Sequence, residues 1–286
     1  MIKFQKSPSS LFLALLVAFS VIAFPGLSAP AVEEPLPDER PSIATRVKEK
    51  AVALIDRDAI RVPIILYHHV RPISNDMDQL GKDLSVTPER FSGHLAEFKK
   101  QGFHTIGLQD FADALEKKKP LPSKPVIFTF DDGYENAYTV ALPILERHGM
   151  TGTVFVIGNA VGTPGYLSWG QLEDMVDSGV FEIQSHSLNH PDLASLSPEL
   201  LRYELLGSKD LLESRLGLPM TFLCYPYGKY SAQVADAAKH AGYRGAVTTK
   251  YGTLHTKGAL FETSRVRLTQ HDTGARLEKK IRFLAH

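Results

Sequence analysis

Short apolar segments alternate with amphipathic helical segments over most of this chain. Six apolar runs are expected as strands, several of them apolar on both faces as buried parallel strands are: residues 62–67, 125–130, 152–157, 180–184, 221–225 and 246–249. The segments between them carry helix start signals, such as Thr87 before Pro88 and a capping box that begins at Ser168. This alternation predicts an α/β fold in which a parallel sheet closes, or nearly closes, into a barrel.

The first 31 residues have the pattern of an export signal. Lys3 and Lys6 precede a 14-residue apolar stretch over residues 11–24, and a small-residue triplet follows at 29–31. Because the stretch is short for a membrane span, we predict a signal peptide over residues 1–31, with an uncleaved anchor as the alternative. The protein is therefore expected to be exported, either periplasmic or extracellular, with association with the cell envelope.

Two further parts follow this segment. Residues 32–61 open with prolines and acids, and they are expected to form a leader or linker with one short helix whose apolar face carries Val47, Ala51 and Leu54. Residues 62–286, about 225 residues, have a length that is normal for one α/β barrel. We therefore predict one folded domain after the leader.

The charge balance and the cysteine content exclude some classes of protein. Lys+Arg and Asp+Glu both number 32, and the notable basic run at 117–119 ends at Pro120, so the clustered cations on which nucleic-acid binding depends are lacking. The single cysteine, Cys224, rules out an internal disulfide framework. The composition therefore predicts a nearly neutral globular protein with no nucleic-acid partner.

Polar residues follow four of the predicted strands at the point where each strand ends. They are His68-His69, Asp131-Asp132, His186 and the segment 225–228. Because the carboxyl ends of parallel barrel strands share one face, these residues converge although they are far apart in the sequence. The sequence therefore predicts an active site at the C-terminal end of the barrel.

Two of these groups have the composition of a metal site. Asp131 and Asp132 would repel each other unless one of them holds a cation, whereas the structural alternative is an ordinary helix N-cap. His186 and His190 are four residues apart, so both can reach one metal ion, although exposed histidines also fall at this spacing by chance. Two histidines and one carboxylate on one barrel face leave coordination positions open for water and substrate, as metal-assisted catalysis requires.

Three motifs in a fixed order carry a family resemblance. Thr-Phe-Asp-Asp-Gly at 129–133, His-Ser-x-x-His at 186–190 and Tyr-Pro-Tyr-Gly at 225–228 resemble the polysaccharide deacetylases with a NodB-homology domain, carbohydrate esterase family 4. The resemblance covers roughly residues 62–268, and the segment 65–70 is similar to the subgroup that includes deacetylases of poly-β-1,6-N-acetylglucosamine. The resemblance implies a distorted (β/α)7 barrel as a single catalytic domain, which hydrolyses N-acetyl groups of an amino-sugar polysaccharide.

The resemblance also implies a role for each residue that matches the motifs. One divalent metal ion, usually zinc, is held by Asp132, His186 and His190. Asp131 is the base that takes a proton from the attacking water, while the metal polarises the acetamide carbonyl. The proton for the departing amine comes from His68, the first histidine after the opening strand.

Four further side chains have two interpretations each. His69 and His255 are the alternatives to His68 as the acid, because His69 is its neighbour and Leu254-His255 resembles a late Leu-x-His of other family members. Trp169 either stacks on a sugar or packs on the barrel from its capping box. Asp192 either orients His190 or caps a loop.

The segment around Tyr-Pro-Tyr-Gly departs from the commonest family pattern. By resemblance, Pro226 and Tyr227 wall the substrate groove, and the Tyr227 backbone N–H faces the oxyanion. Many family members have an arginine two residues before this proline, where it orients the base carboxylate, but this chain has Cys224. We predict that Arg265 supplies the missing cation; the alternative is an ordinary surface arginine.

Other classes of function are compatible with parts of this pattern. A non-catalytic carbohydrate-binding barrel would keep the groove, and a metallo-deacylase of another acyl substrate would keep the metal residues. Two histidines and one carboxylate also suit non-haem iron oxygenases, but these favour a β-sandwich-type frame. We therefore predict a zinc-dependent hydrolase whose partner is an acetylated amino-sugar polysaccharide.

Overall fold

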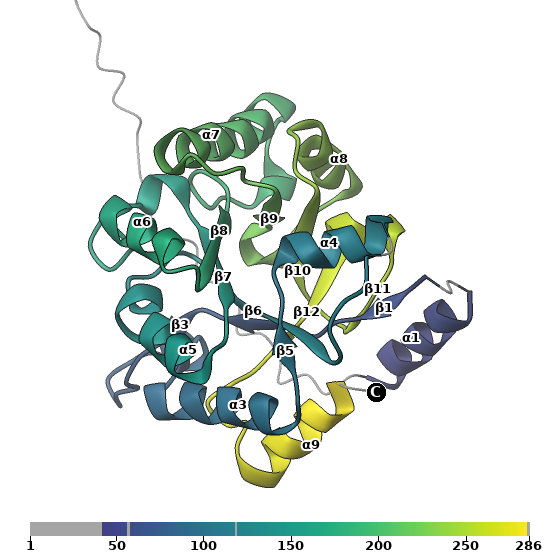
Figure 1. Cartoon of the computed structure of the whole chain (residues 1–286). Coiled ribbons are helices and arrows are strands. Elements are labelled where there is room, and N and C mark those ends of the chain that lie inside the picture. The colour runs from purple at the N-terminus through teal and green to yellow at the C-terminus, as the bar shows by residue number, and fades with distance from the viewer. Residues whose placement is uncertain (1–41, 56–57, 118, 285–286) are drawn as a thin grey trace, which may run out of the picture. The chain divides into compact units, whose positions relative to one another are not determined.

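The computed structural model shows a closed barrel of seven parallel strands (Figure 1). In order around the barrel they are β2 (Ile64–Tyr67), β12 (Thr263–Arg267), β10 (Gly245–Tyr251), β9 (Phe222–Cys224), β8 (Phe181–Ser185), β7 (Gly152–Val156) and β6 (Pro125–Phe130), which pairs with β2 again. A short strand, β5 (His104–Thr105), pairs in parallel with the beginning of β6. Each of the six predicted runs forms a barrel strand, and the predicted α/β barrel is confirmed.

The structure describes residues 42–55, 58–117 and 119–284. The predicted signal peptide at 1–31 and the first part of the predicted leader lie outside the described residues.

Helices surround the barrel on its outer face (Figure 1). They are α1 (Ile43–Ile55), α2 (Gln79–Asp83), α3 (Pro88–Lys100), α4 (Leu108–Lys117), α5 (Leu142–His148), α6 (Trp169–Asp177), α7 (Pro198–Leu216), α8 (Ala232–His240) and α9 (Gly274–Leu284). Two small strand pairs lie outside the barrel: β1 (Ile60–Arg61) with β11 (Leu254–His255), and β3 (His69–Val70) with β4 (Ser85–Val86).

The predicted helix starts are confirmed by their capping hydrogen bonds. The Thr87 hydroxyl accepts a hydrogen bond from the Arg90 N–H at 3.2 Å, and Pro88 occupies the first position of α3. Ser168 and Gln171 form a reciprocal capping box at the start of α6, with bonds of 3.2 and 2.8 Å.

The barrel is distorted between β8 and β9. Backbone pairing between these strands is limited to Ser185 with Leu223. One side chain replaces part of the missing ladder, because Gln184 Oε1 accepts hydrogen bonds from the backbone N–H groups of Thr221 and Phe222 at 2.9 and 2.8 Å. The buried donors at the start of β9 are therefore satisfied although the strands diverge.

The barrel interior is apolar from its N-terminal end, which α4 covers, up to Cys224 at the end of β9. We call it the lower interior cluster: Val62, Ile64, Ile106, Leu108, Phe111, Ala112, Leu115, Ile127, Phe155, Phe222, Cys224, Val247 and Leu260. The barrel is therefore a packed core at this end, and a site for solutes is left at the opposite end.

The predicted leader helix is present as α1, and the two residues of its predicted apolar face whose side chains are described are exposed. Val47 is 62% exposed, and Ala51 is exposed as well. The helix is instead fixed by Glu49, whose carboxylate accepts hydrogen bonds from the Thr253 N–H at 3.0 Å and from the Arg61 guanidinium at 3.2 Å. These polar contacts join α1 to the β1–β11 pair.

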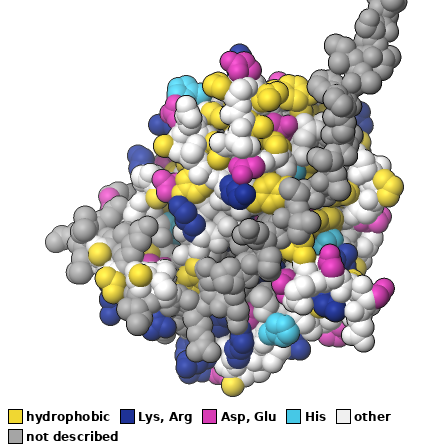
Figure 2. Space-filling view, turned by 180° about the vertical axis from the view of Figure 1, so that it is seen from behind, with side chains coloured by type: hydrophobic (Ala, Val, Ile, Leu, Met, Phe, Trp, Pro, Cys, Tyr) yellow, Lys and Arg dark blue, Asp and Glu magenta, His cyan; other side chains and the backbone are white. Residues whose placement is uncertain are grey.

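The surface of the described residues carries mixed charge. On the face seen in Figure 2, Lys and Arg side chains lie at several separate places, interspersed with acidic and apolar side chains. Some basic residues form local ion pairs, such as Arg244 with Asp113 at 2.9 Å and with Glu116 at 2.7 Å. Within 42–55, 58–117 and 119–284, no helix combines the length and apolar character that crossing a bilayer requires.

Candidate active site

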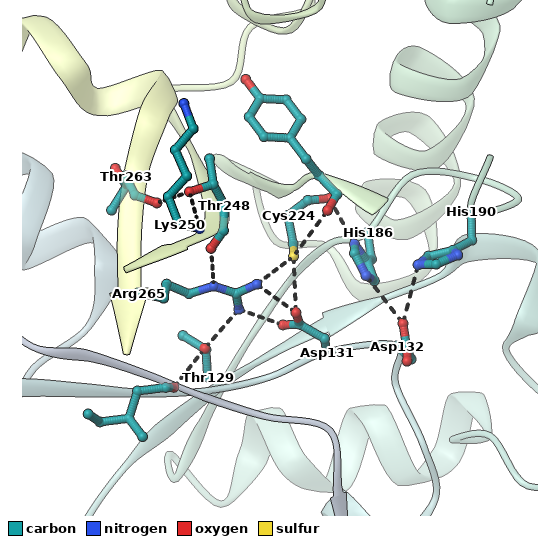
Figure 3. Close-up of polar contacts among 12 residues, drawn as sticks. Thr129, Asp131, Asp132, His186, His190, Cys224, Thr248, Lys250, Thr263 and Arg265 are labelled. Atoms are coloured by element: carbon teal, nitrogen blue, oxygen red, sulfur yellow. Dashed lines mark hydrogen bonds and ion pairs between the residues drawn. The ribbon is translucent and has the colours of Figure 1, made fainter. Parts of the chain in front are cut away.

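The C-terminal ends of the barrel strands bring the predicted polar residues together (Figure 3). Asp131 and Asp132 directly follow β6, and His186 directly follows β8. Cys224 ends β9, and Arg265 lies in β12. The parallel direction of these strands places the five residues within one buried group, as the sequence pattern predicts.

Asp132, His186 and His190 have the geometry of a metal-binding set. Their ligand atoms all lie within 4.8 Å of one another, and Asp132 Oδ1 lies 3.2 Å from His186 Nε2 and 3.4 Å from His190 Nε2. Ligands held at about 2.0–2.1 Å around one tetrahedral zinc ion are separated by about 3.3 Å, so the spacing fits this metal. Two imidazoles and one carboxylate also match the donor types that zinc prefers.

The surroundings prepare these side chains for binding a cation. His186 Nδ1 lies 2.8 Å from the Cys224 carbonyl oxygen, and a hydrogen bond donated there leaves Nε2 facing Asp132. A His186 ring that is protonated at both nitrogens also donates through Nε2 to Asp132, at the place that a metal ion would take. Burial opposes ionisation of Asp132, but this hydrogen bond and nearby positive charge keep the pKa of this carboxyl well below its usual value. The set therefore presents an ionised carboxylate and an oriented imidazole nitrogen.

Strained backbone is concentrated at this end of the barrel. Asp132, Ser187, His190 and Tyr227 adopt the left-handed region with φ of 73°, 62°, 60° and 58°, and they are four of the five non-glycine residues with positive φ in the described residues. Each such residue costs roughly 1–3 kcal/mol, so the surrounding contacts must hold it in place. The site is therefore built at a conformational cost that the rest of the fold offsets.

Asp131 is paired with a buried arginine. Arg265 is 1% exposed, and it donates through Nη1 to Asp131 Oδ1 at 2.7 Å and through Nη2 to Oδ2 at 2.6 Å. Its Nε donates to the Thr248 carbonyl oxygen at 2.8 Å, and Nη1 also donates to the Thr129 hydroxyl at 3.0 Å. Arg265 is thus not a surface arginine, and the bidentate contact fixes the plane of the Asp131 carboxylate.

Cys224 lies beside this ion pair. Its Sγ is 3.3 Å from Asp131 Oδ2 and 3.3 Å from Arg265 Nη2. Burial would raise the pKa of Asp131, but the charge and hydrogen bonds of Arg265 keep this pKa below its ordinary value. Asp131 is therefore an oriented carboxylate that is ionised at neutral pH.

The three candidate acids occupy different environments. His68 is 3% exposed, and its charge is among the interactions that lower the pKa of both Asp131 and Asp132. His69 Nδ1 accepts a hydrogen bond from the Asn136 amide at 2.9 Å, because the amide oxygen of Asn136 already accepts the Val70 N–H. Burial lowers the pKa of His69 to about 3, so this histidine is neutral at pH 7.

His255 lies at the other end of the barrel. Its Nε2 is 2.9 Å from the carbonyl oxygen of Val62, which precedes β2, whereas His68 follows β2. The six residues from Val62 to His68 span roughly 20 Å when extended, so His255 lies about this far from the end of the barrel that holds the site. This position contradicts His255 as an alternative acid. Burial lowers the pKa of His255 to about 4, and the ring packs edge-on against Phe111 of α4.

The remaining predicted residues divide into those at the site and those outside it. Tyr227 lies at the site, because its ring centroid is 4.6 Å from that of His190 and its hydroxyl donates to the His190 carbonyl oxygen at 3.3 Å. Trp169 packs against the apolar core with the Arg215 guanidinium 4.8 Å from its ring centroid, which favours the packing interpretation. Asp192 caps a short helical turn and pairs with Lys229 at 3.3 Å.

Pro226 is buried in the turn next to Tyr227. Together these two residues occupy the turn after β9, where the sequence predicts a groove wall.

Two residues that contact the site escaped the sequence analysis. The Tyr134 ring stacks on His69 with centroids 3.7 Å apart and on Tyr166 with centroids 5.1 Å apart, and burial and the charge of Asp132 raise the pKa of its hydroxyl. Its position directly after the Asp-Asp-Gly turn is the sequence feature that could have placed it at the site. The second is Glu204, and the feature that could have revealed it is an acidic residue among the leucines of the buried face of α7.

Comparisons with known proteins agree with this geometry. Residues 118–246 match the sequence profile of the family described as polysaccharide deacetylase. A polysaccharide deacetylase from Bacillus cereus is 30% identical, covers 78% of this chain, is itself covered to 69%, and superposes with a TM-score of 0.69. The Streptococcus pyogenes deacetylase PplD in complex with acetate is 27% identical over 78% of this chain and 98% of its own, with a TM-score of 0.71.

A curated relative gives the same family. The poly-beta-1,6-N-acetyl-D-glucosamine N-deacetylase of Staphylococcus epidermidis is 28% identical over 197 residues, which are 62% of this chain and 68% of that protein. The barrel, the order of the motifs and these similarities together show that the chain belongs to the polysaccharide deacetylase family, the NodB-homology hydrolases of carbohydrate esterase family 4, which act on carbon–nitrogen bonds other than peptide bonds.

Proposed function

We propose that this enzyme is a zinc-dependent N-deacetylase that releases acetate from a polysaccharide containing N-acetylglucosamine. The observation that carries the proposal is the placement of Asp132, His186 and His190 within 4.8 Å of one another beside the Asp131–Arg265 pair. A zinc ion held by these three residues would supply Lewis-acid activation of the water and of the acetamide carbonyl. The chain's own side chains would then direct the proton transfers.

Asp131 is the proposed base. It accepts a proton from the water whose oxygen forms the new bond to the carbonyl carbon, and its carboxylate is ionised for this purpose. Arg265 is the proposed orienting residue, because its two nitrogens hold both carboxylate oxygens at 2.7 and 2.6 Å. A carboxylate that is held in one orientation is already aligned with the water whose proton it accepts. Such an ion pair therefore removes the entropic cost of orienting the base.

His68 is the proposed acid. When the carbon–nitrogen bond breaks, His68 gives a proton to the departing amine, so that acetate is released and the polymer keeps a free amino group. His69 is a poor candidate because its Nδ1 is an acceptor from Asn136 and burial lowers its pKa to about 3. The Tyr227 backbone N–H is the proposed donor to the developing oxyanion, and Pro226 and Tyr227 form the proposed wall of the groove.

The substrate and the location are further parts of the proposal. The Staphylococcus epidermidis relative is named for poly-beta-1,6-N-acetyl-D-glucosamine, and the segment 65–70 is similar to that subgroup. This polymer is therefore our first candidate, followed by peptidoglycan and chitin-like oligomers. The predicted signal at 1–31 supports an exported enzyme that meets its polymer at the cell envelope.

Acetate release tests this proposal directly. The chain from residue 32 onward, stripped of metal and then restored with zinc, is assayed against oligomers of N-acetylglucosamine with different linkages. We expect release that requires zinc, and a decrease of about 10²–10⁴-fold for Asp131→Asn. Asp177→Asn, at an exposed position in α6, is the matched control and should keep full activity. Zinc bound at one equivalent without release from any oligomer would instead favour another acyl substrate or a carbohydrate-binding barrel.

A further inference from the structure

A buried carboxylate on α7 fastens the loop that carries the two histidines. Glu204 is 6% exposed, and its Oε2 accepts hydrogen bonds from the backbone N–H groups of Leu188 and Asn189 at 3.0 and 2.8 Å. Its Oε1 accepts the side-chain amide of Asn189 at 2.7 Å. One side chain thus satisfies three donors from two consecutive residues between His186 and His190.

An apolar contact fastens the same loop from two sides. Leu188 is buried between Gly158 and Gly207, and a Cβ at Gly207 would lie 2.9 Å from Leu188 Cδ2. A Cβ at Gly158 would lie 3.1 Å from Leu188 Cδ1. The Gly158 N–H also donates to the Ser187 carbonyl oxygen at 3.1 Å. The two glycines therefore form a notch that fits the Leu188 side chain, and no larger residue fits there without displacement of Leu188.

The loop needs this support because its backbone is strained. Ser187 and His190 both adopt positive φ, and the His190 N–H donates to the Ser187 hydroxyl at 2.9 Å. Left-handed non-glycine residues persist only where several contacts hold them. Without Glu204, the N–H groups of Leu188 and Asn189 would lose their acceptor, and the loop could relax away from the geometry that aims His190 at Asp132.

We propose that Glu204 is a positioning residue for the metal site. It holds loop 187–190 in the strained conformation that keeps His190 Nε2 3.4 Å from Asp132 Oδ1. The inference rests on the proposed metal ligation, and it adds that the affinity for the metal is set partly by a carboxylate that does not bind it. Partners of this kind typically contribute about 10–100-fold to metal affinity.

Zinc titration of the full chain with a competing chelator tests the proposal. Glu204→Ala should weaken zinc binding by about 10–100-fold. Glu204→Gln should weaken it less than alanine does, because one amide oxygen can still accept both backbone N–H groups, although the negative charge and the acceptor for the Asn189 side-chain amide are gone. Asp210→Ala, which removes an exposed acidic side chain from the same helix, is the control and should bind zinc as the wild type does. Circular dichroism checks that each variant is folded.

Each contrary outcome has a distinct meaning. Wild-type affinity in folded Glu204→Ala would overturn the positioning role. Equal losses of zinc affinity in the alanine and glutamine variants would overturn it too, because the negative charge of Glu204, and not its hydrogen bonds to the loop, would then account for the loss. If Glu204→Ala does not fold, Glu204→Asp decides, since it keeps the charge but shortens the reach; unchanged zinc affinity there would contradict the proposal. Failure of the wild-type chain to bind zinc would reject the proposed metal site itself.

Discussion

The two ends of the barrel use the same strands for opposite purposes. On β6 and its continuation, Ile127 belongs to the lower interior cluster, whereas Thr129 and Asp131 contact Arg265 at the upper end. These positions are two residues apart, so their side chains share one face of the strand. The same strand therefore carries an apolar core residue and, two residues further along, side chains that contact a buried ion pair.

Backbone strain separates the ends as well. The upper end holds Asp132, Ser187, His190 and Tyr227 in the left-handed region, whereas Lys124, the fifth such residue in the described ranges, precedes β6 at the lower end. The lower end is held by apolar contacts that tolerate small changes of shape, and the upper end by directed contacts that do not. Substitutions at the two ends should therefore differ in what they cost.

The largest expected effect is at the upper ion pair. Arg265→Met should decrease acetate release strongly and should also destabilise the fold by about 3–5 kcal/mol, because Asp131 is left as an uncompensated buried charge. Urea unfolding and the acetate assay measure the two effects.

A double variant sharpens this result. Asp131→Asn combined with Arg265→Met removes both charges, so it should recover much of the lost stability without recovering activity. Normal turnover in the single Arg265→Met variant would contradict the orienting role of the arginine. Equal stabilities of the single and double variants would show that the buried charge is tolerated without its partner.

A smaller effect should appear as a pH dependence at the lower end. Burial lowers the pKa of His255 to about 4 from 6.5. Between these values the unfolded chain binds more protons at this group than the folded chain, so its contribution to stability is complete above about pH 6.5 and is lost as the pH falls toward about 4. The slope is at most about 1.4 kcal/mol per pH unit for one histidine.

Comparison of two glutamine variants isolates this histidine. Urea unfolding of metal-free protein from pH 7 to pH 4 should show a shallower pH dependence for His255→Gln than for the wild type. His271→Gln, at an exposed position, should follow the wild type. The other histidines are the same in the proteins compared, so their contributions cancel in the difference. Parallel curves for His255→Gln and the wild type would show that His255 is not held neutral.

The sequence predicts the local parts of this molecule better than the long-range ones. Strand runs, caps and motif residues depend on neighbours in the chain, and these predictions match the barrel and the convergence at its upper end. Arg265 could be proposed only because a cation was missing beside Asp131; its burial depends on β12 lying across the barrel. The motif left His255 as an alternative to His68, because two residues of sequence do not say at which end of the barrel a loop lies.

The buried carboxylate Glu204 is another long-range feature that the sequence alone does not predict. Its partners lie 15 and 16 residues earlier in the chain, so only the folded arrangement of α7 against loop 187–190 reveals its role. Val47 and Ala51 of α1 are a similar case, because spacing predicts a helix face and not whether another element covers it.

The smallest effect tests whether the two ends are independent. Ile127→Val removes one methylene from the lower interior cluster and should cost about 1 kcal/mol of unfolding free energy. Zinc affinity and acetate release should stay at wild-type values, because a packed apolar interior absorbs this change without moving the charged residues one step along β6. A loss of zinc affinity larger than the loss of stability would mean that Thr129 and Asp131 follow the packing beneath them. Packing at the apolar end would then help to set the geometry of the site. The two ends would differ in the chemical type of their side chains but would not be mechanically independent.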